Sequence, residues 1–378
     1  MKTLRSGLLA LSIGVAVVHT PAHAASIDGP SPGEAATVLA VTSSYAEALP
    51  ALLLQPGFGE PLYHALAGSR EGTVSMDDVL ARVDPQARRA SSELTRQANA
   101  RIRALKGLPE QGPALLRGRL VLPPGTVLGE FGAHELRVAA TPVGDDRAWT
   151  SVRTWGADGT EQWVDADAAV AFPLVMIEVD VRTALKEGLQ LVNAGLRAVG
   201  LQTAPSIGEP LDVTRLDRIR LAVDQEPTLK GAAEIFAISS GLQIDEKKPE
   251  MRTFEMPWLD YDQQDYYPGQ DWIHWGNLRY DVANVQLFEE DGNTNYKAML
   301  EALVKVVGTT IGPFEPTVGM VSMIADRILQ VLPDAWFTDD HDYVDSYYLI
   351  QRNKRYSGWS GAGANAVVDL EPVTVGRH

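Results

Sequence analysis

The chain has 378 residues, no cysteine and a formal net charge of −16 at pH 7. Without cysteine, disulfide frameworks, thiol catalysis, Cys-based zinc sites and a lipoprotein anchor are excluded. The acidic balance disfavours nucleic acid and anionic lipid as partners and favours cations or basic surfaces, although an acidic surface also serves solubility. The length predicts two or three domains.

Residues 1–24 have the pattern of a cleavable export signal. Lys2 and Arg5 form a basic start, residues 8–18 are mostly apolar, and Ala22-His23-Ala24 supplies the small residues that a signal peptidase recognises. The apolar run is about half of the ~20 residues that a membrane span needs. We therefore expect cleavage after Ala24, a periplasmic or secreted location and no membrane anchor.

Residues 25–112 have the periodicity of helices. Apolar residues in 35–53 recur at three- and four-residue spacing, which is typical of an amphipathic helix. Ser75 is a suitable N-cap for a second helix that runs to Val83. A third helix is expected over 85–105, with its arginines on a polar, solvated face.

Residues 113–202 change to the period of strands and then end in a helix. Strands are expected over 115–122, 135–139 and 174–179, separated by turn signals rich in Gly, Pro and Asp. Trp149, Trp155 and Trp163 alternate with polar residues, as in a small meander. A helix over 181–199 and a linker over 203–210 complete this small, mostly β domain.

Residues 211–378 are acidic and contain most of the aromatic residues of the chain. Short alternating segments predict an antiparallel β-sandwich, with strands over 216–223, 233–238, 272–275, 282–287, 343–350 and 366–370. Two helices, over 296–307 and 318–332, are expected as an insertion, and residues 358–361 as a flexible loop. The predicted fold class is therefore α+β and multidomain.

Three acidic clusters, at 260–265, 289–293 and 339–345, lie at the edges of these predicted strands. A fourth acidic segment, at 224–226, ends an earlier strand. Carboxylates this close repel one another unless they face water or share a cation. Ca²⁺ takes about six to eight oxygen ligands at roughly 2.3–2.6 Å. The candidate calcium ligands are Asp224, Glu226, Asp260, Asp262, Asp265, Glu290, Asp291, Asp340, Asp342 and Asp345. The alternative is a set of solvated turns in which Asp and Asn side chains bind backbone groups.

Other chemistry has weaker support in the sequence. The histidines lack the His-Glu-x-x-His arrangement of zinc hydrolases, and His274 fits a packed strand histidine better than a ligand. Residues 358–361 do not form the Gly-x-Ser-x-Gly turn of a serine hydrolase. Two carboxylates suffice for a glycosidase, so the clusters leave that reaction open. The aromatic residues of 258–275 suit either the core or a surface that stacks on sugars.

The runs 231–237, 267–270, 281–297 and 340–346 resemble a bacterial secreted family known as domain of unknown function 3103. This resemblance implies export and a shared fold, and it carries no activity. The acid-rich loops also resemble those of the C-two type calcium sandwich. The helical insertion and the short Asp340-x-Asp342-x-x-Asp345 spacing depart from that pattern, so lipid docking is not implied.

The sequence thus predicts an exported, non-catalytic calcium-binding β-sandwich protein that binds a glycan or a cell-surface protein, with no catalytic residues assigned. The alternative is a secreted calcium-dependent hydrolase, a glycosidase or a peptidase, that uses a carboxylate pair. In a third interpretation the N-terminal half is a pro-region that masks the sandwich.

Overall fold

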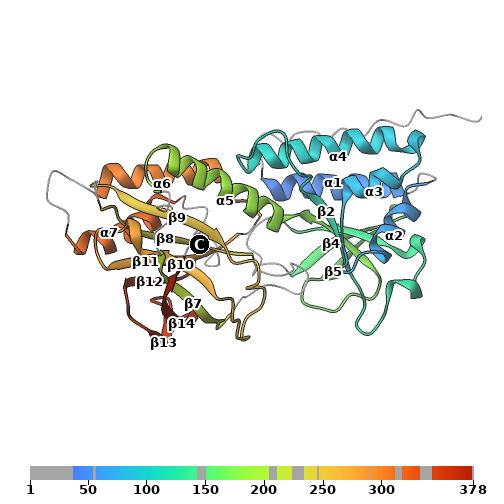
Figure 1. Ribbon diagram of the computed structural model, residues 1–378. Helices are drawn as coiled ribbons and strands as arrows, with labels where there is room; N and C mark the ends of the chain where they lie inside the picture. Colours follow the sequence, from blue (N-terminus) through green and yellow to red (C-terminus); the bar gives the residue numbers. More distant parts are fainter. Residues whose placement is uncertain are drawn as a thin grey trace, which may run out of the picture.

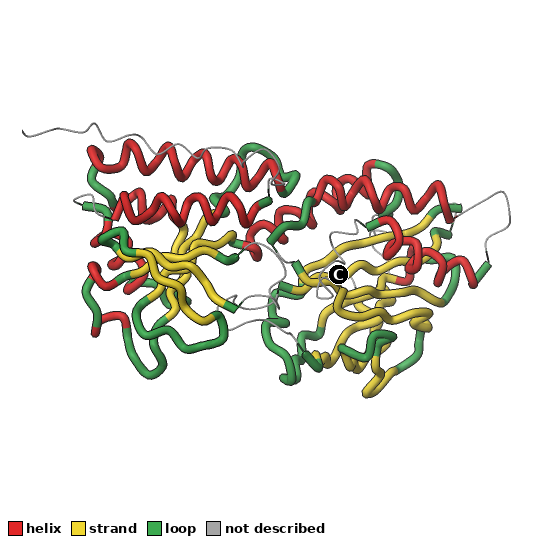
Figure 2. The backbone as a smooth tube through the Cα atoms, turned by 180° about the vertical axis from the view of Figure 1, so that it is seen from behind, coloured by secondary structure: helices red, strands yellow, loops and turns green. Residues whose placement is uncertain are grey.

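The computed structural model describes residues 37–53, 57–142, 150–203, 211–223, 234–244, 247–290, 292–310, 317–332 and 343–376. The predicted export signal, most of the predicted linker and the acidic turns at 224–226 and 340–342 lie outside these residues. The described part is a mixed α+β protein, as predicted. It has two lobes, and in each of them helices lie over one side of a sheet (Figures 1 and 2).

The N-terminal lobe contains the three predicted helices and one that was not predicted. Its helices are α1 (Val38–Leu53), α2 (Gly59–Ala67), α3 (Met76–Arg82) and α4 (Pro85–Leu105). The hydroxyl of Ser75 accepts a hydrogen bond from the backbone N–H of Asp77, which confirms the predicted N-cap of α3. Helix α2 is short and begins Gly59-Glu60-Pro61, so its sequence lacks a long apolar period.

Helices α1 and α4 lie over a six-stranded sheet whose only parallel neighbours are β3 and β6. In spatial order its strands are β1 (Thr73–Ser75), β2 (Leu116–Val121), β6 (Leu174–Val179), β3 (Arg137–Ala140), β4 (Ser151–Gly156) and β5 (Glu161–Asp165). β1 comes from the predicted helical region and pairs with β2, and α1 packs on β3 and β6. The predicted regions 25–112 and 113–202 therefore share one sheet and one hydrophobic core.

The C-terminal lobe contains two antiparallel four-stranded sheets. One has the order β10 (Gln270–His274), β7 (Leu211–Leu221), β14 (Ala366–Val375) and β13 (Tyr356–Ser360). The other has the order β12 (Tyr343–Gln351), β11 (Val282–Glu289), β8 (Ile235–Leu242) and β9 (Pro249–Glu255). β9 was not predicted. The expectation of a flexible loop at 358–361 was wrong for its first residues, because β13 pairs with β14 there.

One hydrophobic cluster joins the two sheets of this lobe, with Trp272, Val285 and Leu370 among its fully buried members. The opposite face of the β11–β8 sheet is covered by α7 (Gly319–Val331) of the predicted helical insertion, and α7 packs on α6 (Tyr296–Thr310). Because both faces are covered, β8 and β11 are buried almost throughout, and the buried amides of Asn284 and Gln286 on β11 donate to backbone carbonyl oxygens of α7.

Helix α5 (Val181–Ala198) leads from the N-terminal lobe into the C-terminal lobe, where it packs on β9 and α6. Its N-cap, Asp180, accepts hydrogen bonds from the backbone N–H and the hydroxyl of Thr183. No helix among the described residues is long and apolar enough to cross a membrane.

Candidate functional site

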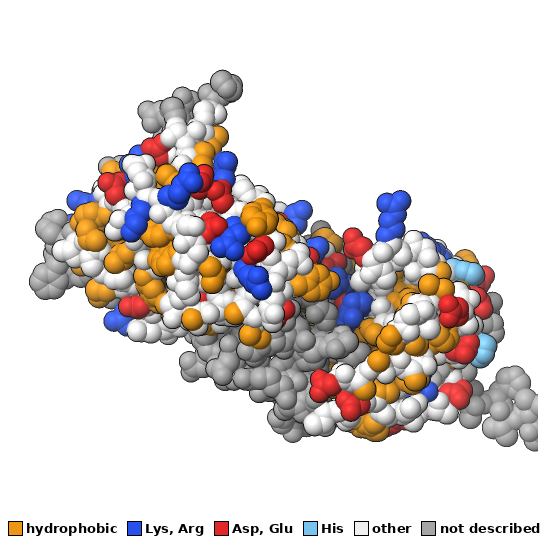
Figure 3. All heavy atoms as spheres, turned by 90° about the horizontal axis from the view of Figure 1, so that it is seen from below, with side chains coloured by type: hydrophobic (Ala, Val, Ile, Leu, Met, Phe, Trp, Pro, Cys, Tyr) orange, Lys and Arg blue, Asp and Glu red, His pale blue; other side chains and the backbone are white. Residues whose placement is uncertain are grey.

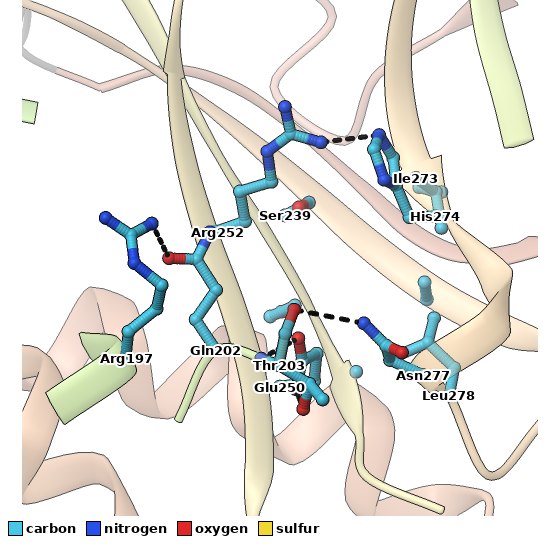
Figure 4. Close-up of a pocket in the computed structure, with 13 residues that line it drawn as sticks. Arg197, Gln202, Thr203, Ser239, Glu250, Arg252, Ile273, His274, Asn277 and Leu278 are labelled. Atoms are coloured by element: carbon cyan, nitrogen blue, oxygen red, sulfur yellow. Dashed lines mark hydrogen bonds between the residues drawn. The ribbon is translucent and has the colours of Figure 1, made fainter. Parts of the chain in front are cut away.

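A cavity of about 250 Å³ lies where β9 and β10, the end strands of the two C-terminal sheets, approach the end of α5 (Figure 4). Its lining residues come from α5, the segment after it, β8, β9, β10, the turn after β10 and the start of β11. They are Arg197, Gln202, Thr203, Ser239, Ser240, Gly241, Glu250, Arg252, Ile273, His274, Asn277, Leu278 and Ala283.

The cavity follows from the order of side chains along β8. Residues of one strand face alternate sides, and Ile235 and Ala237 point into the core between the two sheets. The next two positions on that side are Ser239, whose side chain is short, and Gly241, beside which the side chain of Leu278 lies. On β9 they stand opposite Arg252 and Glu250, so the apolar core ends in a polar pocket.

Arg252 is the central cation of this pocket. Its Nη1 lies 2.5 Å from Nε2 of His274. Because a guanidinium only donates, that nitrogen accepts and the imidazole is neutral. Burial lowers the pKa of Arg252, which the charge of Asp271 partly opposes, yet an arginine stays charged at neutral pH. No carboxylate of the described residues forms an ion pair with it.

Glu250 is the one carboxylate among the described residues of the lining, and its oxygens are already engaged. They accept from the backbone N–H and the hydroxyl of Thr203, each at 2.8 Å, and from the amide of Gln243 at 3.0 Å. Burial raises the pKa of Glu250. Asn277 donates to the carbonyl oxygen of Thr203 at 3.2 Å and so fixes the same wall (Figure 4).

Besides Arg252, two polar side chains among the described lining residues remain available to a ligand. The hydroxyl of Ser239 makes no hydrogen bond within the described part of the chain. Arg197 is exposed at the end of α5, where its only polar contact among described residues is with the side-chain oxygen of Gln202, at 3.1 Å. Figure 4 shows Arg197 beside Gln202, and Arg252 with its guanidinium directed at His274.

The structure describes five of the ten predicted calcium ligands, and two of them pair with arginines. Arg182 binds Asp260 at 3.0 Å, and Arg218 binds Asp265 at 3.0 Å. Asp262 is half-buried and also has an interaction partner. On the face shown in Figure 3, acidic and basic side chains of the C-terminal lobe are interspersed.

The other two predicted ligands that the structure describes, Glu290 and Asp345, are buried. Glu290 forms an ion pair with Lys106 of the N-terminal lobe, with Nζ and Oε1 2.7 Å apart and neither side chain exposed. Asp345 accepts hydrogen bonds from four backbone N–H groups. The segment 361–366 supplies three of these donors and folds around the carboxylate.

No group of three or more His, Asp or Glu side chains among the described residues is arranged to hold a metal ion. The other five candidates, Asp224, Glu226, Asp291, Asp340 and Asp342, lie outside those residues. Calcium binding therefore stays a prediction.

Sequence reasoning missed the pocket because it missed β9. The charged residues at 250 and 252 alternate with Met251 and Thr253, both buried, and this alternation was the available signal. Of the aromatic residues between 258 and 275, Trp272 and Trp275 are buried in the core, whereas Tyr261 and Tyr267 are exposed.

A family model described as "Protein of unknown function (DUF3103)" matches residues 57–378. The match covers most of the chain, so the protein belongs to this family, as its sequence motifs predicted. No curated protein and no solved structure matches the chain.

Proposed function

We propose that this family member is an exported, non-catalytic binding protein whose two C-terminal sheets form a β-sandwich. The pocket at the edge of that sandwich binds one sugar unit of a polysaccharide. The observation that carries the proposal is the polar lining, in which Arg252 and Ser239 keep hydrogen-bonding capacity that no described residue uses. Specific ligand sites typically combine a concave shape with a few polar groups of this kind.

The lining supports binding rather than glycoside hydrolysis. A glycosidase needs two carboxylates that flank the scissile bond. The cavity supplies one, Glu250, and three donors from Thr203 and Gln243 hold its oxygens. Among the lining residues that the structure describes, no second acid stands beside Glu250 for such a reaction.

We expect Ser239→Phe to abolish sugar binding, because the ring would fill the cavity. The measurement is calorimetric titration of the mature chain with a panel of monosaccharides and short oligosaccharides, with product analysis of the same mixtures. Ser357→Phe, at an exposed position of β13, is the matched control and should bind as the wild type does. Release of a shortened sugar would contradict the non-catalytic proposal. If Ser239→Phe binds sugar as tightly as the wild type, the pocket is not the sugar-binding site.

Calcium is a second part of this proposal, supported by the acidic turns of the sequence. After removal of metal with a chelator, titration with Ca²⁺ should release or absorb heat and raise the melting temperature. Asp262→Ala should weaken both effects. If no heat accompanies the titration and the melting temperature does not change, the turns are solvated and the calcium part of the proposal is lost.

A further inference from the structure

We infer that the sugar taken by this pocket is a hydroxylated monocarboxylate of the uronic-acid class, with Arg252 as the counterion of its carboxylate. This inference rests on the proposed binding function and names its ligand. It comes from the charges inside the cavity, from the donors left on Arg252 and from the size of the space.

The charge of Arg252 has no partner of opposite sign within the described chain. His274, its hydrogen-bond partner, is neutral in this contact. Asp271, the one acid that acts on it over a longer range, is held by Arg215, with Nε and Oδ1 3.0 Å apart. A desolvated charge without a counterion is unfavourable. An anionic ligand would remove that cost, whereas a neutral sugar would leave it.

The guanidinium retains donors for such a ligand. It has five N–H groups in a fixed planar fork, and the contact with His274 uses one of them. His274 also fixes the orientation of the fork, so less conformational entropy is lost on binding. Two parallel N–H donors match the two oxygens of a carboxylate, and such bidentate bonds are among the strongest in proteins.

Glu250 limits the charge of the ligand. Its carboxylate lies in the same wall, two residues before Arg252 on β9. A dianion such as a phosphate ester would place a second negative charge near it, and like charges disfavour one another. Burial raises the pKa of Glu250, because its carboxylate has lost part of its hydration. A monoanion fits this balance better.

The remaining lining fits the hydroxyl groups and the size of one sugar. Ser239 and Asn277 present short polar side chains to the cavity. The volume of about 250 Å³ lies just below the range of roughly 300–1,000 Å³ for drug-sized ligands. Arg197, exposed at the rim, adds positive charge along the approach of an anion, which raises association rates.

The test is calorimetric titration of the mature chain with D-glucuronate and D-galacturonate, compared with glucose, galactose and glucose 6-phosphate. A uronate should bind at least about tenfold more tightly than the corresponding neutral hexose, and more tightly than the phosphate ester. Its affinity should fall as salt is added. Arg252→Gln should lose about tenfold or more for the uronate and little for the hexose.

Arg220→Gln, at an exposed position of β7 outside the pocket, is the matched control and should bind as the wild type does. If Arg252→Gln does not fold, the electrostatic attraction of the uronate can be tested in two other ways. The substitution Arg197→Gln, and the addition of salt to the wild type, should each weaken uronate binding. Equal affinity for hexose and uronate, or tighter binding of glucose 6-phosphate, would overturn this inference and leave the proposed function intact. If no sugar binds, both fail.

Discussion

Asp345→Ala should destabilise the protein by about 4 kcal/mol or more, because it leaves four backbone N–H groups without an acceptor. Oδ1 accepts from Ser346 and Gly363, each at 2.7 Å, and Oδ2 accepts from Asn365 at 3.0 Å and Ala366 at 2.7 Å. The carboxylate is fully buried, so the four donors have no access to bulk water in the native fold. The free energy of unfolding, measured with urea, checks this expectation.

Asp345→Asn keeps the shape of the side chain but replaces one of its two acceptor oxygens. An amide keeps one oxygen and brings an NH2 group against N–H donors, so we expect a loss smaller than that of Asp345→Ala but still of about 2 kcal/mol. Both losses should be the same in chelator and in excess Ca²⁺. A loss that appears only with Ca²⁺ present would show that Asp345 is a metal ligand instead of an anchor for the segment 361–366.

The close approach of the backbone to Asp345 also requires a glycine. A Cβ atom built on Gly361 would lie 2.2 Å from Cγ of Asp345, so only glycine allows the chain to approach the carboxylate so closely. The Gly-rich segment after Trp359 therefore has a structural role in wrapping a buried anion, which explains its composition without a catalytic serine.

Lys106→Met should destabilise the protein by about 3–5 kcal/mol, because it leaves Glu290 buried without its cation. The carboxylate would keep the hydroxyl of Tyr296 at 2.8 Å and the backbone N–H of Gly292 at 3.1 Å, which do not neutralise its charge. The measurement is again urea unfolding, monitored by tryptophan fluorescence.

The double variant Lys106→Met/Glu290→Gln tests the reason for this loss. It removes both charges together, so its stability should return to within roughly 1 kcal/mol of the wild type. The control pair is Arg96 and Glu93, whose charged atoms are 2.6 Å apart but whose side chains are mostly exposed. Arg96→Ala should cost less than about 1 kcal/mol. If Arg96→Ala costs as much as Lys106→Met, burial is not the cause.

The same ion pair joins the two lobes. Lys106 follows α4, and Glu290 follows β11, whereas the backbone N–H of Tyr296 at the start of α6 donates to the carbonyl oxygen of Lys106 at 2.9 Å. Asn295 donates to the carbonyl oxygen of Leu105 at 2.7 Å. These polar contacts at a buried joint hold the two lobes in one arrangement. If the N-terminal half were removed as a pro-region, Glu290 would lose its cation, Lys106.

Periodicity in the sequence identified most elements of this fold. The helices at 85–105 and 181–198 and the strands at 116–121 and 282–289 each have a one-sided or continuous apolar pattern, so local sequence was sufficient. β9 escaped because one of its faces carries Glu250 and Arg252, which line a polar pocket, and only the other face, with Met251 and Thr253, is covered by α5. β13 escaped because Ser357 and Gly358 separate its two aromatic residues, Tyr356 and Trp359.

In contrast to these elements, the candidate site could not be predicted from the local sequence. The acidic clusters are conspicuous in the sequence, yet the partners of Glu290 and Asp345 come from residues far away in the chain or from backbone groups, which composition does not reveal. Arg252 and His274 are inconspicuous in the sequence. They become a site only because the edge strands of two sheets meet where β8 carries Ser239 and Gly241.

By itself the sequence determined the mixed α+β class, nearly all helices, most strands and the family, because these depend on local periodicity and on short runs of residues. Only the tertiary structure decided which groups the described carboxylates contact. A carboxylate acts as a metal ligand, an anchor or half of an ion pair according to the donors around it, and those donors are brought together by packing between distant segments.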